Sequence, residues 1–270
     1  MIYLGTSGYS YDDWKGVYYP PEVPNHGRLT YYSSEFDAVE LNFTFYGMPT
    51  ADLLNGLTAQ TPEGFRFAVK AHQDITHHRR GDPTPFAQFR AALAALRPMQ
   101  ASATHQENAR HLAGKLGAVL LQFPYAFRNT KENVYYLEHC FKQLRELPLI
   151  VEFRNNDWVT QRTLGLLREW GVGFCNVDMP KLPGLLPQTG IVTAPTAYVR
   201  LHGRNANKWW KHDEAWERYD YTYAESELAG WVPHLREMSE QAEDVFVFAN
   251  NHWQGQSIAA VRQLKMLLEG

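Results

Sequence analysis

Short apolar segments recur along the chain, and amphipathic stretches separate most of them. The segments are rich in Val, Ile, Leu and Phe, which is typical of strands buried on both faces of a parallel sheet. The expected strands are 2–6, 38–42, 65–72, 118–123, 149–154, 173–178, 197–203 and 244–250. The expected helices are 29–36, 51–61, 86–96, 131–145, 160–170, 224–241 and 256–268. Residues 179–196 are rich in Pro and Gly and predict a loop.

Strands that alternate with helices imply right-handed parallel crossovers. Eight such units, with no linker between them, predict an α/β fold: one (β/α)8 TIM-type barrel that spans residues 1–270 as a single domain. An open doubly wound sheet is the alternative. That fold normally carries a Gly-rich nucleotide turn after its first strand, and Gly5-Thr6-Ser7-Gly8 lacks the required spacing.

Composition and charge limit the kinds of partner and the cellular location that we expect for this protein. The net charge of −3 gives no reason to expect nucleic acid or an acidic membrane as a partner. No apolar stretch approaches the roughly 20 residues that span a bilayer. Cys140 and Cys175 are far apart and lack metal-ligand spacing, so we expect both to be reduced. The N-terminal residues do not resemble a signal peptide, and we expect a cytoplasmic protein.

Polar side chains cluster near the carboxyl ends of seven of the eight expected strands. They are Glu40 and Asn42, Lys70 and His72, Gln122, Glu152 and Arg154, Asn176 and Asp178, Arg200 and His202, and Asn250. Within a strand the members are two residues apart, so they share one face. Active sites of TIM-type barrels lie at this end of the strands. The pattern therefore predicts a ligand site at the mouth of the barrel.

Two other interpretations of these residues stay open. The charged groups could neutralise one another inside the barrel and bind nothing. Alternatively Glu152, Asp178 and His202, on three consecutive strands, could bind a metal ion. Arg154 and Arg200 oppose a cation at that place, and we expect no bound metal and no cofactor.

Aromatic side chains add a second feature to the expected mouth. Five tryptophans fall in loops that follow strands, namely Trp14, Trp158, Trp209, Trp210 and Trp253, and Tyr46 and Tyr125 lie in similar loops. Flat apolar rings there could stack on a sugar or an aromatic acid. They could equally pack the loops onto the rim of the barrel.

Several segments form a set of recognisable motifs. They are Gly5-Thr6-Ser7-Gly8-Tyr9, Val39-Glu40-Leu41-Asn42, Phe67-Ala68-Val69-Lys70-Ala71-His72, Leu120-Leu121-Gln122-Phe123-Pro124, Val151-Glu152-Phe153-Arg154, Val199-Arg200-Leu201-His202-Gly203 and Phe248-Ala249-Asn250-Asn251. As a set they resemble the DUF72 family, also called YecE-like proteins, whose activity is not established. The motifs run through the whole chain in order. The resemblance implies a TIM-type barrel. Residues 98–111 look longer than is usual in the family.

Our hypothesis is a pocket for a small anionic or sugar-like molecule, in either an acid/base enzyme or a non-catalytic binding module. A metal-dependent isomerase or hydrolase of a sugar-like substrate is the other alternative. The candidate catalytic residues are Glu40, Lys70, His72, Glu152, Asp178 and His202. The candidate ligand-binding residues are Asn42, Tyr46, Gln122, Arg154, Trp158, Arg200, Asn250 and Asn251.

Overall fold

The computed structural model, which describes residues 1–97 and 114–270, contains a closed barrel of parallel strands in the order β1 to β8. The strands are β1 (Ile2–Ser7), β2 (Ala38–Leu41), β3 (Arg66–Lys70), β4 (Leu116–Gln122), β5 (Leu149–Glu152), β6 (Gly173–Asp178), β7 (Thr196–Leu201) and β8 (Asp244–Ala249). All eight predicted strands are present, and the predicted barrel is confirmed. The suggested long segment 98–111 lies outside the described residues.

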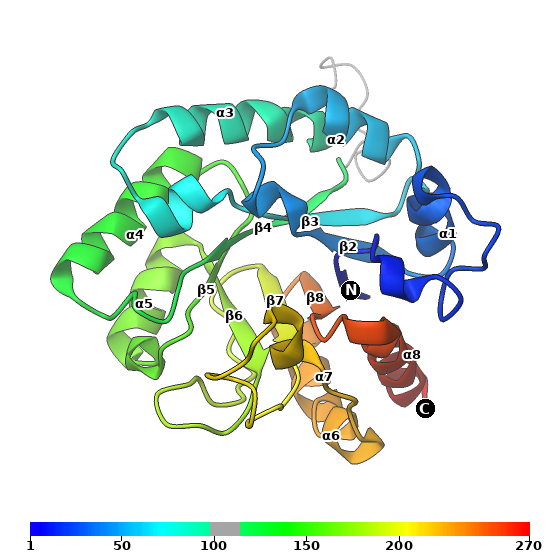
Figure 1. The fold of residues 1–270 in the computed structure, drawn as a ribbon. Helices are drawn as coiled ribbons and strands as arrows, with labels where there is room; N and C mark the ends of the chain where they lie inside the picture. The colour runs from blue at the N-terminus through cyan, green and yellow to red at the C-terminus, as the bar shows by residue number, and fades with distance from the viewer. Residues whose placement is uncertain (98–113) are drawn as a thin grey trace.

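Helices form a ring outside the strands (Figure 1). They are α1 (Arg28–Ser33), α2 (Ala51–Thr58), α3 (Thr84–Leu93), α4 (Lys131–Leu144), α5 (Gln161–Trp170), α6 (Glu225–Ala229), α7 (Val232–Gln241) and α8 (Gln256–Glu269). The single helix predicted over 224–241 was wrong, because the segment is divided into α6 and α7. Pro233 has no amide hydrogen and is accommodated in the first turn of α7. As predicted, β6 is followed by a loop.

The barrel interior below the mouth is filled by aromatic rings. Tyr3 of β1 stacks on Phe246 of β8 with the ring centroids 4.8 Å apart, and Tyr198 of β7 lies 5.3 Å from Phe248. Tyr198 precedes Arg200 on β7, and Phe246 and Phe248 precede Asn250, which follows β8. The polar residues at the carboxyl ends of β7 and β8 therefore lie above an aromatic layer.

Strand register sets the height of the polar residues in the barrel. Ser7 pairs with Glu40 across β1 and β2, and Gln122 pairs with Glu152 across β4 and β5. Ser7, Gln122 and Glu152 end their strands and Glu40 is the next-to-last residue of β2, so the side chains meet at the carboxyl end of the barrel. The fold thereby gathers groups that are far apart in the sequence.

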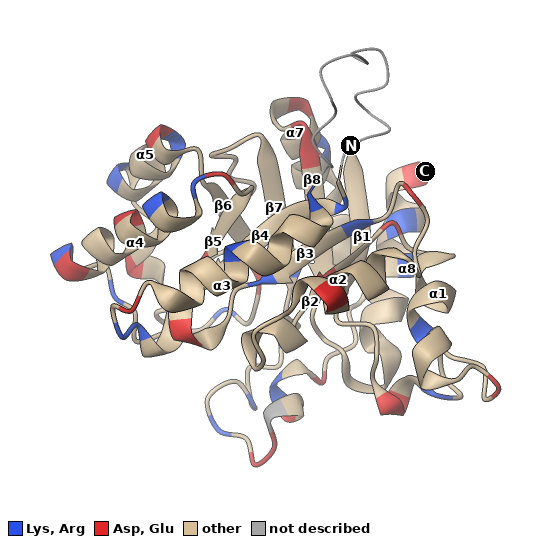
Figure 2. Ribbon diagram, turned by 90° about the horizontal axis from the view of Figure 1, so that it is seen from above, with Lys and Arg blue, Asp and Glu red and all other residues tan. Residues whose placement is uncertain are grey.

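Charged residues of both signs are interspersed over the outer helices, as on α4 and α5 (Figure 2). No helix among the described residues is long and apolar enough to cross a membrane. Cys140 and Cys175 are both free and buried, as the sequence predicts.

The contact between β1 and β2 leaves no room for a side chain at Gly5. A Cβ atom there would lie 2.0 Å from the backbone oxygen of Ala38. Gly5→Ala should therefore force the strands apart and lower the free energy of unfolding by about 1–3 kcal/mol or more in urea denaturation. Gly56→Ala is the matched control, because Gly56 lies in α2 with open space around it. That change should raise stability by about 0.5–1 kcal/mol. Equal effects of the two substitutions would contradict the packing argument.

Candidate functional site

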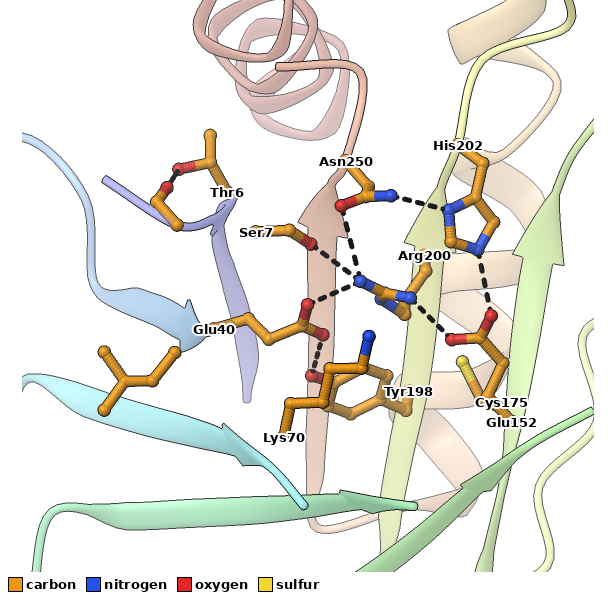
Figure 3. Close-up of polar contacts among 12 residues, drawn as sticks. Thr6, Ser7, Glu40, Lys70, Glu152, Cys175, Tyr198, Arg200, His202 and Asn250 are labelled. Carbon is orange, nitrogen blue, oxygen red and sulfur yellow. Dashed lines mark hydrogen bonds and ion pairs between the residues drawn. The ribbon is translucent and has the colours of Figure 1, made fainter. Parts of the chain in front are cut away.

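A guanidinium held between two carboxylates lies at the centre of the barrel mouth (Figure 3). Arg200 Nη2 donates to Glu40 Oε1 at 2.6 Å, and Arg200 Nη1 donates to Glu152 Oε2 at 2.7 Å. All three side chains are buried. The Tyr198 hydroxyl donates to the other oxygen of Glu40 at 2.7 Å. We call Glu40, Arg200 and Glu152 the ionic centre.

His202 and Asn250 complete the surroundings of the ionic centre. Arg200 Nη2 lies 3.4 Å from Asn250 Oδ1, so the Asn250 amide nitrogen faces His202 Nδ1 at 3.0 Å. The amide nitrogen donates and His202 Nδ1 accepts, so His202 Nε2 carries the hydrogen that points to Glu152 Oε1 at 3.2 Å. Burial, reinforced by Arg154, lowers the pKa of His202 to about 3. His202 is consequently neutral at physiological pH.

Arg154 adds a second guanidinium to the ionic centre. Its Nε lies 2.5 Å from Glu152 Oε1. Burial alone would raise the pKa of the Glu152 carboxyl, but Arg154 and Arg200 outweigh burial and hold that pKa well below its usual range. Two carboxylates thus face two guanidiniums, and their formal charges cancel.

Lys70, at the end of β3, carries an amine that takes no part in this cancellation of charges. Among the described residues its Nζ makes no hydrogen bond or ion pair, and it lies 4.3 Å from the centre of the Phe45 ring. The nearby carboxylates already bind Arg200, Arg154 and Tyr198. Burial, with the Arg200 guanidinium adding to it, lowers the pKa of the Lys70 amine to about 7. A substantial share of Lys70 is therefore unprotonated at neutral pH.

A cavity of about 300 Å³ opens above Lys70. It is lined by Phe45, Tyr46, Lys70, His77, Gln122, Pro124, Tyr125, Arg154, Leu185, Trp209, Trp210, Arg218 and Tyr219. Three of these residues are cationic and none is Asp or Glu. The remaining wall is mainly aromatic. This combination gives the cavity cationic groups in its lining and flat apolar sides.

The cavity wall comes from loops that follow six different strands, β2 to β7. The segment after β3 forms a single π-helical turn, Asp74–His78, which carries His77. Such turns occur often at functional sites. His77 lies against the Phe45 ring at 4.7 Å between ring centroids, and burial lowers its pKa to about 4. Arg218, after β7, donates to the Trp209 backbone oxygen at 3.0 Å. His77 is thus a neutral group and Arg218 a fixed cation at the cavity.

Most predicted site residues converge, but they form two levels. Glu40, Glu152, Arg200, His202 and Asn250 form the buried lower level and do not line the cavity. Tyr46, Lys70, Gln122 and Arg154 line the cavity above them. The predicted acid/base carboxylates are thus enclosed and fully hydrogen-bonded, whereas Lys70 is at the surface of the cavity.

The prediction that Asn176 and Asp178 face the same site was wrong. Asn176 hydrogen-bonds to the Ile191 backbone, outside the barrel. Asp178 accepts hydrogen bonds from Arg204 and from the buried Trp231 at 2.7 Å. Every residue of β6 is buried, so alternation alone could not identify its inward face. The inward residue is Cys175, which lies beside Glu152 (Figure 3).

The metal site considered from the sequence is not assembled. Asp178 belongs to a different cluster from Glu152 and His202, and no three His, Cys, Asp or Glu residues in the described ranges are placed to hold a metal ion. His72 also lies apart from the ionic centre. Its Nδ1 accepts from the backbone nitrogen of Asp74 at 3.3 Å.

Trp158 packs inside the loop layer instead of facing the cavity. It is 1% exposed, stacks on Phe153 with 4.4 Å between ring centroids, and donates to the Phe127 backbone oxygen. Asn251 is also buried and donates to the Tyr221 backbone oxygen at 2.8 Å. Asn42 follows β2 and does not line the cavity. For Trp158 the structure favours a packing role over the predicted contact with a ligand, and neither Asn251 nor Asn42 lines the cavity.

Sequence reasoning missed Arg218 and Tyr219. Both lie in the short helix Ala215–Tyr219, far from any strand end. The loop between β7 and α6 is long and rich in aromatic and basic residues. That feature is the signal that could have pointed to them.

The geometry of Arg200 favours a structural role. Arg200→Met would leave Glu40 and Glu152 buried without their shared cation, so the free energy of unfolding should fall by about 3–5 kcal/mol in urea denaturation. Arg262→Met is the control, because Arg262 pairs with Glu35 at the surface and its loss should change stability by at most about 1 kcal/mol. A loss below about 1 kcal/mol for Arg200→Met would contradict the structural role.

Lys70 is expected to reduce stability. Its pKa is about 7 in the folded protein and 10.5 ordinarily, so between these pH values the unfolded chain binds a proton that the folded chain does not. Stability therefore rises with pH across this window. Lys70→Met should be more stable than the natural protein by about 1–3 kcal/mol at pH 7, and the difference should shrink toward pH 10.5.

Lys115 provides the matched control for this experiment. Its Nζ donates three hydrogen bonds of 2.8 Å, to the backbone oxygens of Thr58 and Thr61 and to the Thr61 hydroxyl. Lys115→Met should lower stability by about 1–3 kcal/mol. If Lys70→Met were destabilised to the same extent at every pH, Lys70 would be a structural residue.

Comparison with known proteins agrees with the sequence motifs. The model of the family described as "Protein of unknown function DUF72" matches residues 3–270. The UPF0759 protein YunF of Bacillus subtilis is 35% identical and is aligned over 100% of this chain and 95% of its own length. A DUF72 structure from Thermotoga maritima is 37% identical over 100% of both chains, with a TM-score of 0.85. One from Enterococcus faecalis is 28% identical over 100% of this chain and 96% of its own, with a TM-score of 0.84. The chain therefore belongs to the DUF72 family, whose function is unknown.

Proposed function

We propose that the cavity at the barrel mouth binds a small organic anion and that Lys70 exchanges a proton with it. The observation that carries this proposal is the charge of the lining: Lys70, Arg154 and Arg218 face the cavity, and no carboxylate from residues 1–97 or 114–270 lines it. An anion would be held by two fixed guanidiniums. Planar guanidinium groups suit carboxylate and phosphate groups.

The aromatic walls support a ligand with a flat or sugar-like part. Tyr125 and Trp210 meet edge to face at 4.9 Å between ring centroids, and Tyr46 and Trp210 are largely exposed. Exposed aromatic faces of this kind stack on aromatic rings or on the apolar face of a sugar. The volume of about 300 Å³ is at the lower end for small-molecule sites.

Proton transfer is assigned to Lys70 because of its environment. Glu40 and Glu152 are enclosed and paired, so neither is free to accept a proton from a ligand in the cavity. The pKa of about 7 makes Lys70 an effective base at neutral pH. Its conjugate acid can return the proton. A strongly shifted pKa within a cavity is characteristic of enzymes more than of binding modules.

A non-catalytic binding module is the second candidate. It is favoured by the enclosure of both candidate catalytic carboxylates, which leaves one amine and the neutral His77 as the titratable groups suited to catalysis. Such a module would bind the anion equally well without changing it. Cytoplasmic location and the lack of nucleic-acid and membrane partners remain predictions from the sequence.

Matched ligand pairs test the proposed binding. We expect benzoate and glucose 6-phosphate to raise the melting temperature in differential scanning fluorimetry, while the neutral benzamide and glucose do not, at equal ionic strength. Arg218→Gln removes a cavity cation and should weaken binding of the anions at least about tenfold, or about 1.4 kcal/mol. Arg236→Gln, on the exposed face of α7, is the control and should behave like the natural protein.

Two results would contradict the proposal. Neutral and anionic members of each pair could stabilise the protein equally, or the response to anions could survive unchanged in Arg218→Gln. Either result would place the binding of anions outside this cavity.

A further inference from the structure

Lys70 has an arrangement that proton transfer alone does not require. Its Nζ and the His77 ring lie against the same Phe45 side chain, at 4.3 Å and 4.7 Å from the ring centre. The amine therefore sits in an apolar corner of the cavity with an imidazole nearby. Among the described residues no acceptor forms a hydrogen bond with the amine, so no such bond stabilises its protonated form.

We propose that Lys70 attacks a carbonyl group of the bound anion and forms an imine, so that the substrate class is an anionic aldehyde or ketone. This inference rests on the proposed binding of an organic anion. It adds the reacting group of the ligand and the covalent role of the lysine.

The reaction balances with groups that are present. The neutral amine uses its lone pair to form a C–N bond with the carbonyl carbon, and the carbonyl oxygen takes up a proton to give a carbinolamine. The nitrogen then loses a proton, which passes to the hydroxyl oxygen. The freed nitrogen lone pair forms the C=N bond as the C–O bond breaks, and the oxygen leaves as water with its two protons. The product is a protonated imine, a stronger electron acceptor than the original carbonyl. Hydrolysis reverses every step and restores the amine.

Side chains of the cavity provide the proton carrier and the anion-binding groups that these steps require. His77 is held by a hydrogen bond of 2.9 Å between its Nδ1 and the Thr76 hydroxyl, and it is neutral at physiological pH. It is the group suited to carry a proton to and from the carbinolamine oxygen. Arg154 and Arg218 would hold the carboxylate or phosphate of the substrate, which fixes the carbonyl relative to Lys70. The protonated imine would then lie directly above the carboxylates of the ionic centre.

Burial favours a neutral amine before the reaction, and the charges that face Lys70 act in both directions. Arg200 and Arg154 lower its pKa, whereas Glu152 and Glu40 raise it, and His77 contributes no charge near neutral pH. Formation of the imine should follow the fraction of unprotonated amine. The rate should be half-maximal near pH 7 and level off about one pH unit higher, while reactions of exposed lysines should continue to rise toward about pH 10.

Reductive trapping tests the covalent step. The protein would be incubated with glyoxylate, an anionic aldehyde, and cyanoborohydride, and the modified lysines mapped by peptide mass spectrometry. At pH 7 we expect carboxymethylation of Lys70 to exceed that of any exposed lysine by about tenfold or more. Acetaldehyde, a neutral aldehyde of similar size, should label Lys70 far less efficiently. The preference for glyoxylate should disappear in Arg218→Gln.

Lys70→Arg separates failure of the imine from failure of anion binding. This variant keeps a cation in the cavity, so glucose 6-phosphate should still raise its melting temperature, and it should show no specific trapping. If the natural protein binds the anions but traps Lys70 no better than exposed lysines, the imine is refuted and the proposed binding stands. If Lys70 is trapped equally by glyoxylate and acetaldehyde and anions do not bind, the amine is reactive but the anionic substrate class is refuted.

Discussion

The barrel mouth depends on one buried interaction, the Arg200 guanidinium shared by Glu40 and Glu152. Burial of any one of these charges alone would be prohibitive, and removal of one partner leaves the others uncompensated. Hydrogen bonds from Tyr198 and His202 satisfy the remaining oxygens. The side chains come from three strands, β2, β5 and β7, so the interaction also fixes how those strands sit relative to one another. It thereby supplies a rigid floor for the cavity.

The charge balance of that floor explains why the Lys70 amine lacks a compensating negative charge. Arg154 and Arg200 neutralise the two carboxylates, and no negative charge is left for a third cation. The amine is therefore held in a dry place where its charged form is disfavoured. Such an arrangement costs stability and is expected to persist only where it serves a function. A ligand anion that enters the cavity would supply the missing negative charge, which couples binding to the protonation of Lys70.

The sequence predicted the barrel and the centre of the site because both depend on local patterns. Apolar runs marked each strand, and spacing by two placed Glu40, Glu152, Arg200 and His202 at one end. The same pattern failed for Asp178, because β6 is buried on both faces and alternation does not identify the inward one. It also could not separate Trp158, which packs against Phe153, from an aromatic residue of the cavity wall. These distinctions depend on long-range packing, which spacing along the chain does not encode.

The upper level of the site was the least predictable part. Arg218 and Tyr219 reach the cavity from a loop that folds back over the mouth, so their position depends on contacts such as the Arg218 bond to Trp209. The sequence likewise did not show that the two carboxylates would be paired in the floor of the cavity while the Lys70 amine would be the reactive group. Glu152 and Lys70 are both charged residues at strand ends, and only their partners distinguish them.

The ionic centre is complete without Lys70 and leaves the Lys70 amine without a compensating negative charge. NMR titration of protein labelled with ¹³C at the lysine Cε positions measures this property of the amine, with Lys70→Arg used to assign the signal. We expect a midpoint for Lys70 near pH 7, whereas exposed lysines should titrate at about pH 10.4. A midpoint for Lys70 at or above about pH 10 would show that its charge is compensated in the barrel and that the ionic centre is not complete without it.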